Sequence, residues 1–256
     1  MNVMKTVQKV YDLMMDGGNE NLDKATKLIN SIKKEDLRKL SKTELGEFFF
    51  LYGKLAYLKD FPDEAIKLLK TSLKLRSKSK KSEVLYYIAS SYSDKEKFKL
   101  AMKYLNNALN CNNTSVELKI KILTELCISC ENLDEFNKER QYANQIIEIY
   151  KNNPNSEFDK YYYCLALSNL VTVYWKLQDE KKADEYANKL LSMKKVPQSI
   201  RRITYNILGH RFWWKKEHGK AIECYRKALK YAKGKDEVKH DKDLIKNCKE
   251  DIKASK

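Results

Sequence analysis

Two cysteines three residues apart are the most chemically suggestive feature of the sequence. Cys127 and Cys130 lie in the stretch CISC, which has the CxxC spacing of redox-active thiols and of one half of a zinc site. A complete zinc site of this type needs a second ligand pair, and the chain has no second CxxC. A redox pair needs its first thiol exposed at a helix N-terminus. Both kinds of chemistry therefore depend on the element that carries the two cysteines.

Other residues typical of ligation or catalysis are sparse. The three histidines, His210, His218 and His240, have no cysteine or glutamate at ligand spacing, so we expect no metal ion. The sequence also lacks a glycine-rich phosphate loop, a dinucleotide-binding fingerprint and a G-x-S-x-G nucleophile elbow, and we expect no cofactor. These observations predict a protein that is not an enzyme.

The chain of 256 residues carries a formal net charge of +16, which raises the hypothesis of an anionic partner. Seven Lys or Arg and no acidic residue lie between Ile66 and Lys81, so nucleic-acid binding is an alternative function. Nucleotide bias in a genome also produces such lysine-rich usage. No apolar run approaches the ~18 residues of a membrane span, and the N-terminus has no signal-peptide pattern. We therefore expect a cytoplasmic protein without membrane contact.

An internal pattern is clearest from Ile203 to Ala232. It places an aromatic residue, Leu-Gly and a second aromatic on one helix, followed by Ala, an aromatic and Ala on the next. These positions are Tyr205, Leu208, Gly209, Phe212, Ala221, Tyr225 and Ala228. Small residues at Gly209 and Ala221 allow two antiparallel helices to approach closely. Scarce glycine and proline, 7 and 3 residues, favour an all-α chain throughout.

The second-helix alanine, which we call the ruler position, recurs through the chain. Its copies are Ala25, Ala65, Ala101, Ala183 and Ala221, and alignment of RQYANQII on DEYANKLL places Glu139 in the missing slot. Successive ruler positions are 36 to 44 residues apart. The pattern resembles the tetratricopeptide repeat (TPR), whose period is about 34 residues. This resemblance implies an all-α solenoid of about six helical hairpins.

The predicted hairpins form a single TPR-like domain over residues 1–256. Their approximate ranges are 3–35, 43–77, 82–111, 115–152, 158–194 and 198–233. The charged stretch 236–254 predicts a C-terminal helix that caps the last apolar face. Asp60 to Pro62 should break the second hairpin, and Pro154 and Pro197 fall between repeats, where helices should end.

The resemblance also implies a binding surface, because the first helix of each TPR hairpin lines the concave side of the solenoid. We expect aromatic, amide and hydroxyl side chains there, a mixture suited to an extended peptide. The predicted residues are Phe50, Lys54, Tyr57, Tyr86, Tyr87, Ser90, Thr124, Ser168, Asn169, Thr172, Trp175, Asn206, His210 and Trp213, and Lys121 and Glu125 accompany Thr124 in the fourth repeat. A competing interpretation is that several of the rings pack between repeats or beneath the final helix.

The leading functional hypothesis is a non-enzymatic scaffold that binds a protein or peptide on this surface. TPR proteins that bind chaperone tails use a clamp of Lys, Arg and Asn, and Phe50, Tyr86 and Thr124 replace it here. Long repeats and groove asparagines such as Asn169 are similar to the sensor half of Gram-positive peptide-binding regulators. The alternative is therefore a signalling-peptide sensor without the DNA-binding domain, for which the chain has no room before its first repeat. Self-association through the apolar stretch 48–58 is a further hypothesis.

The repeat register also interprets the CxxC pair. Cys127 takes the position held by Gly209, and Cys130 takes the position held by Phe212. Both are packing positions well inside a helix, where cysteine serves as a small hydrophobic residue. The sequence therefore predicts two core cysteines rather than a redox or zinc site.

Overall fold

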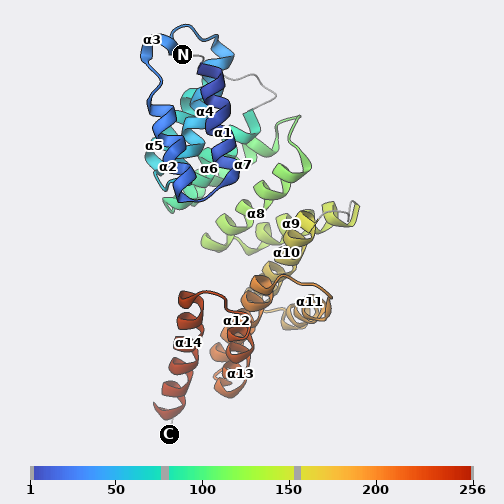
Figure 1. Cartoon of the computed structure of the whole chain (residues 1–256). Coiled ribbons are helices and arrows are strands. Elements are labelled where there is room, and N and C mark those ends of the chain that lie inside the picture. Colours follow the sequence, from blue (N-terminus) through green and yellow to red (C-terminus); the bar gives the residue numbers. More distant parts are fainter. Residues whose placement is uncertain (1–2, 76–80, 153–156, 255–256) are drawn as a thin grey trace. The chain divides into compact units, whose positions relative to one another are not determined.

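The computed structural model describes residues 3–75, 81–152 and 157–254, and these segments form fourteen α-helices and no strand (Figure 1). The helices are α1 (Val3–Asp16), α2 (Asn19–Asn30), α3 (Lys34–Leu37), α4 (Lys42–Leu58), α5 (Pro62–Leu75), α6 (Lys81–Asp94), α7 (Phe98–Leu109), α8 (Val116–Asn132), α9 (Phe136–Asn152), α10 (Glu157–Lys176), α11 (Glu180–Ser192), α12 (Gln198–Trp214), α13 (His218–Leu229) and α14 (Lys235–Ala254). The predicted all-α fold is confirmed. No helix in these segments is long and apolar enough to cross a membrane.

The chain divides into two compact units, Met1–Leu133 and Asp134–Lys256. In the first unit the pairs α1–α2, α4–α5 and α6–α7 pack as hairpins, and α8 packs on α7. In the second unit α10 packs on α9 and α11, and α13 packs between α12 and α14. The predicted break between the helices of the second hairpin lies between Leu58 and Pro62. Pro154 lies outside the described residues, and the single continuous domain stays a prediction.

The hairpin turns share a backbone feature that fixes the repeat register. Five residues before each of the last five ruler positions, one residue adopts the left-handed conformation, with φ between 55° and 62°: Asp60, Glu96, Asp134, Gln178 and Lys216. The next residue donates its N–H to a carbonyl five residues earlier in four of these turns, for example Phe61 to Ala56. Such bonds satisfy carbonyls at a helix C-terminus. The ruler positions themselves are at most 1% exposed, Glu139 included.

Gly209 allows the close packing of α12 on α13 that the repeat pattern predicts. A Cβ atom at Gly209 would lie 2.4 Å from Cε1 of Tyr225, well inside van der Waals contact. Tyr225 is 1% exposed, so its ring has no space in which to retreat. The absence of a side chain at Gly209 is therefore a condition for placing the Tyr225 ring across α12.

Overpacking of a well-filled site costs about 1–3 kcal/mol. Alanine improves a helix interior by ~1 kcal/mol, so we expect the Gly209→Ala variant to be destabilised by up to about 2 kcal/mol. Gly219 is the matched control, because it lies in α13 and a Cβ there would meet no atom within 4 Å. Urea unfolding should show Gly219→Ala to be as stable as the wild type or more so. An equally stable Gly209→Ala variant would contradict the packing.

The CxxC cysteines lie in the interior of α8. Cys127 and Cys130 are both 0% exposed, and α8 begins at Val116, eleven residues before Cys127. The first thiol is therefore remote from the helix N-terminus that would lower its pKa. Among the described residues, no group of three or more His, Cys, Asp or Glu side chains is arranged to hold a metal ion. The burial of Cys127 and Cys130 supports their interpretation as core residues.

A labelling experiment tests this placement. We expect iodoacetamide to modify Cys111, which is partly exposed, at least about tenfold faster than Cys127 or Cys130 in the native protein. In denaturant the three rates should converge, because burial no longer protects the thiols. Site-resolved mass spectrometry measures all three in one sample, with Cys111 as the internal control. Rapid native labelling of Cys127 would restore the redox interpretation.

Candidate functional site

Aromatic side chains predicted for the concave face come together on α4 and α6. The ring centroid of Tyr87 lies 5.9 Å from that of Phe50, 5.5 Å from Tyr57 and 5.3 Å from Tyr86. The interplanar angles are 59° to 72°, in the edge-to-face range that aromatic pairs prefer. Phe50 is buried, whereas the three tyrosines are half-buried. The result is a fixed aromatic surface whose tyrosines remain partly accessible.

Lys54, also predicted for this face, contacts the same aromatic group. Its Nζ lies 5.1 Å from the centroid of the Tyr87 ring and 3.9 Å from Oε1 of Glu83. Burial lowers the pKa of the Lys54 ammonium, opposed by the Glu83 charge and assisted by that of Lys121. The Tyr87 ring thus already bears one cation on its face, as the ring quadrupole favours.

Two carboxylates lie beside the tyrosines. Burial, with a smaller contribution from the charge of Asp94, raises the pKa of Glu125 in α8 to about 7. Burial and the charge of Asp60 raise the pKa of Asp94, the last residue of α6. Among the residues that the structure describes, neither Asp94 nor Glu125 forms an ion pair. Unpaired, partly buried carboxylates are unexpected in a chain with sixteen excess positive charges.

The tyrosine hydroxyls respond to these carboxylates. Burial raises the pKa of Tyr57 to about 12, and the charges of Asp94 and Glu125 add to the increase. Burial and the Glu125 charge also raise the pKa of Tyr86. Both hydroxyls therefore stay protonated at physiological pH. We call Tyr57, Tyr86, Tyr87, Asp94 and Glu125 the tyrosine–carboxylate cluster.

The chemistry of this cluster suits a cation. Tyrosine faces attract ammonium and guanidinium groups, and a nearby carboxylate supplies the compensating charge. A cation close to Glu125 would favour the ionised carboxylate and lower its pKa. The cluster contains no arrangement of nucleophile, general base and oxyanion donors, so binding rather than covalent chemistry is what these side chains support.

Four predicted hydroxyl residues are buried. Ser90 is 2% exposed, and Thr124 donates to the carbonyl of Ile120 within its own helix, at 2.9 Å. Ser168 is 0% exposed, and its Oγ lies 3.0 Å from Oγ1 of Thr204, joining α10 to α12. Thr172 is 8% exposed. Each of these four residues lies on the buried side of its helix and therefore contributes to helix packing.

The predicted residues of the second unit fall into two groups. Asn169 and Trp175 are half-buried on α10, and Lys176 Nζ lies 5.0 Å from the Trp175 ring centroid. Asn206, His210 and Trp213 on α12 instead bond to the following helices. Asn206 Nδ2 donates to Asp241 at 2.9 Å, His210 Nδ1 lies 3.1 Å from the Tyr225 hydroxyl, and Trp213 Nε1 donates to Asp251 at 2.6 Å. The capping helix α14 thus uses side chains that the sequence assigned to the concave face.

Asp94 is absent from the predicted concave face, whereas Glu125 was expected on that face beside Thr124 but was not among the candidate binding residues. Glu125 lies on the expected face of the fourth repeat. The sequence alone does not indicate that it lacks a cationic partner among the described residues. Asp94 lies at the C-terminus of α6, outside the positions used to predict the face. The only sequence signal was their position near the tyrosine-bearing turns of neighbouring first helices.

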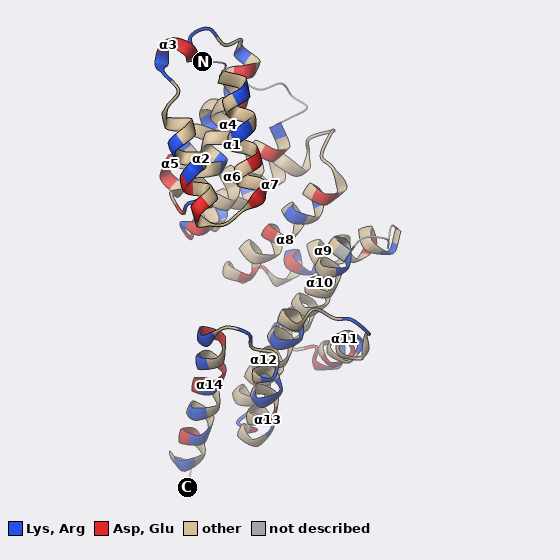
Figure 2. Cartoon of the chain, in the orientation of Figure 1, with Lys and Arg blue, Asp and Glu red and all other residues tan. Residues whose placement is uncertain are grey.

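Positive charge is distributed along the helices. Figure 2 shows Lys and Arg interspersed with Asp and Glu, for example along α14. The basic run from Ile66 occupies α5 as far as Leu75, and residues 76–80 lie outside the described part. The described part of this run belongs to an amphipathic helix, in which Ile66 and Leu69 are buried.

Comparison with known proteins identifies the repeats. The tetratricopeptide-repeat family model matches residues 166–196 and 204–234. The chain contains tetratricopeptide repeats. The two TPR matches overlap the fifth and sixth predicted hairpins, and the predicted resemblance is confirmed. No curated protein sequence matches the chain.

Solved structures share the TPR fold across nearly the whole chain. The apo form of RapI has a TM-score of 0.76 at 17% identity, covering 97% of this chain and 74% of RapI. The apo form of the quorum sensor NprR from B. thuringiensis has a TM-score of 0.74 at 15% identity, covering 94% of this chain and 68% of NprR. A chain of the APC/C Cut9–Hcn1 hetero-tetramer has a TM-score of 0.62 at 14% identity, over 89% of this chain but only 39% of its own length. These similarities establish the fold.

Proposed function

We propose that the chain is a non-enzymatic TPR scaffold that binds a segment of a protein or peptide, and that the tyrosine–carboxylate cluster receives a basic side chain of that segment. The observation that carries the proposal is Glu125, a partly buried carboxylate beside Tyr57 and Tyr86 that forms no ion pair with any described residue. Burial of a carboxylate without a partner costs stability. A ligand cation would remove that cost and convert it into binding free energy.

The tyrosines supply the remaining part of the interface. Half-buried Tyr57, Tyr86 and Tyr87 are held by mutual ring contacts, so they lose little conformational entropy when a ligand covers them. Tyrosine is enriched among residues that dominate binding energy because it combines a large ring with a hydroxyl. A lysine or arginine side chain would pass its alkyl stem along these rings and place its charge at Glu125.

A signalling-peptide sensor is the second candidate function. It is supported by the fold shared with the quorum sensor NprR over 94% of this chain. The two candidates differ in the ligand, which is a free short peptide for a sensor and an internal segment of a folded partner for an adaptor. Free peptides and the same sequences embedded in a loop of a carrier protein would separate them.

Binding to a peptide array tests the proposal. We expect octapeptides containing Lys or Arg to be enriched over neutral ones, although the net charge of +16 repels them at long range. Glu125→Gln should weaken the best peptide by at least about tenfold, the loss expected for one partly buried charged contact. Binding by the wild type should strengthen as pH rises through about 7, because Glu125 then ionises.

Glu117→Gln is the matched control. Glu117 lies on the same helix, is paired with Lys121, and has a side chain 60% exposed. This variant should bind the basic peptide like the wild type. Equal binding by Glu125→Gln and the wild type, or no preference for basic peptides, would exclude the cluster as the site.

A further inference from the structure

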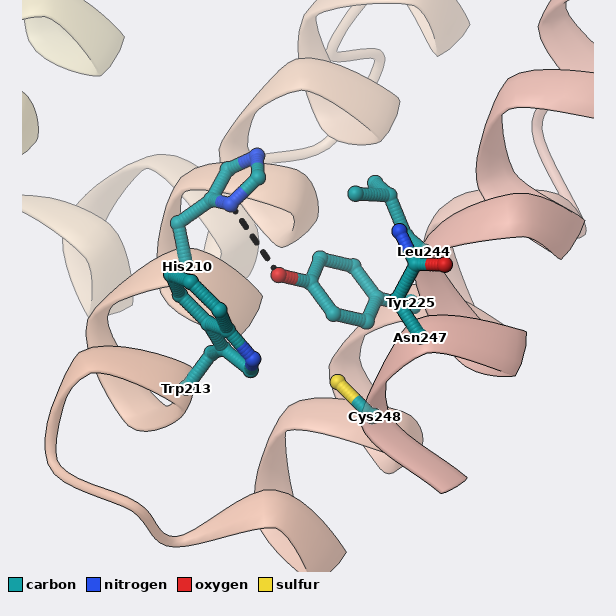
Figure 3. A pocket seen from close by; sticks show the side chains of 6 residues that line it. All are labelled: His210, Trp213, Tyr225, Leu244, Asn247 and Cys248. Carbon is teal, nitrogen blue, oxygen red and sulfur yellow. Dashed lines mark hydrogen bonds between the residues drawn. The ribbon is translucent and has the colours of Figure 1, made fainter. Parts of the chain in front are cut away.

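A pocket lies in the second unit, between the last hairpin and the capping helix. It has a volume of about 130 Å³ and is lined by His210, Trp213, Tyr225, Leu244, Asn247 and Cys248 (Figure 3). The first two residues come from α12, Tyr225 from α13, and the other three from α14. In Figure 3 the Tyr225 ring lies between His210 and Trp213 on one side and the α14 side chains on the other. The pocket is separate from the tyrosine–carboxylate cluster, which belongs to the first unit.

Hydrogen bonds fix the walls of this pocket before any ligand arrives. The Tyr225 hydroxyl lies 3.1 Å from Nδ1 of His210, and the two rings meet edge to face at 73°. Nε1 of Trp213 donates to Asp251 at 2.6 Å, which ties this ring to α14. Gly209 leaves the space in which the Tyr225 ring lies. A binding site whose side chains are already held loses little entropy when it is occupied.

The lining combines aromatic and apolar surface with a few polar atoms. Rings of Trp213 and Tyr225, the Leu244 side chain and the Cys248 thiol form the apolar part, and sulfur and ring edges pack favourably against another aromatic ring. No described residue bonds to Nε2 of His210 or to the Asn247 amide. Burial and the charge of His240 lower the pKa of His210, which favours its neutral imidazole.

The volume limits the ligand to one ring. Apolar cavities of about 150 Å³ in proteins bind benzene. A neutral imidazole offers either a donor or an acceptor at Nε2, depending on which way the His210–Tyr225 bond runs. A hydroxyl group matches both states because it can donate and accept.

We propose that the α12–α13–α14 pocket binds a single aromatic ring carrying a hydroxyl group, with the ring against Tyr225 and Trp213 and the hydroxyl on His210. The ring can come from a small phenol or from a tyrosine side chain of a peptide. Both sources present the same chemistry, and they differ in whether the pocket mouth admits a polypeptide backbone.

The test uses the full chain and two probes. We expect p-cresol to bind with 1:1 stoichiometry and a dissociation constant on the order of 1 mM or below, measured from the NMR shift of the Trp213 indole proton. Saturating p-cresol should also slow alkylation of Cys248, which lines the pocket and is 1% exposed. Acetyl-Gly-Tyr-Gly-amide forms the second arm. Binding of both probes assigns the pocket to a tyrosine side chain, and binding of p-cresol alone assigns it to a free phenol.

Variants on α14 and α12 make the result specific. Leu244→Trp should fill the pocket and weaken p-cresol at least about tenfold, whereas Lys246→Trp, at an exposed position of the same helix, should leave binding unchanged. Toluene lacks the hydroxyl and should bind to the wild type more weakly than p-cresol does. The His210→Phe variant should bind toluene and p-cresol with equal affinity. The proposal is overturned if the wild type shows no saturable binding of p-cresol, or if Leu244→Trp binds p-cresol as tightly as the wild type. The wild-type titration tests the proposal even if Leu244→Trp folds poorly.

Discussion

The Asp241→Ala variant is expected to release the capping helix α14 from α12, at a cost of about 3–5 kcal/mol. Asp241 is 0% exposed and accepts from Nε and Nη2 of Arg202, both at 2.8 Å, and from Asn206 at 2.9 Å. Removal of Asp241 leaves the Arg202 guanidinium, whose side chain is 12% exposed, with only the partly exposed Glu237 as an ionic partner at 3.3 Å. Amide hydrogen exchange should accelerate at least about hundredfold in α14, since about 1.4 kcal/mol corresponds to tenfold.

Two variants control this experiment. Asp243→Ala removes an exposed carboxylate from the same helix and should leave exchange in α14 unchanged. The double variant Arg202→Met/Asp241→Leu replaces the pair with apolar groups and should recover much of the loss, because buried ion pairs and apolar replacements are often similar in stability. If α14 exchanges at the wild-type rate in Asp241→Ala, the pair does not hold the cap.

The second large effect concerns stability as a function of pH at Glu125. The folded state raises the pKa of this carboxyl from its usual 4.5 to about 7, so folding favours the protonated form. The stabilisation that the raised pKa of Glu125 gives to the folded state is complete below pH 4.5 and is lost as pH rises through about 7. The shift corresponds to about 3 kcal/mol at most. Glu125→Gln, which cannot ionise, should therefore be more stable than the wild type at pH 8 by up to this amount.

Urea unfolding at pH 5 and pH 8 measures the difference. At pH 5 Glu125 is mostly protonated in the folded state, so the two proteins should differ by far less than at pH 8. Addition of the best basic peptide at pH 8 should stabilise the wild type more than Glu125→Gln, because only the wild type gains an ion pair. A constant difference at both pH values would mean that Glu125 titrates normally and that the cluster is open to water.

The repeat architecture could be predicted because its signals are local. Five of the six hairpins have an alanine at the ruler position, and all have helical apolar spacing that can be read within about 40 residues of sequence. The slot taken by Glu139 was predicted from the alignment of its flanking residues, and the left-handed Asp134 in the structure agrees with that register. The left-handed turns themselves were not predicted, because Asp, Glu, Gln and Lys replace the glycine that usually signals them.

By itself the sequence determined the helical hairpins, their register and the burial of Cys127 and Cys130, since these depend on periodicity along one chain segment. Tertiary structure alone decided which polar groups meet. Asp94 and Glu125 lie 31 residues apart on different helices; desolvation raises both pKa values, with a further contribution from the charge of Asp60 at Asp94 and from the charge of Asp94 at Glu125. Likewise, α14 takes Asn206 and Trp213 as hydrogen-bond donors. Desolvation and charge proximity act through space, so spacing along the sequence does not encode them.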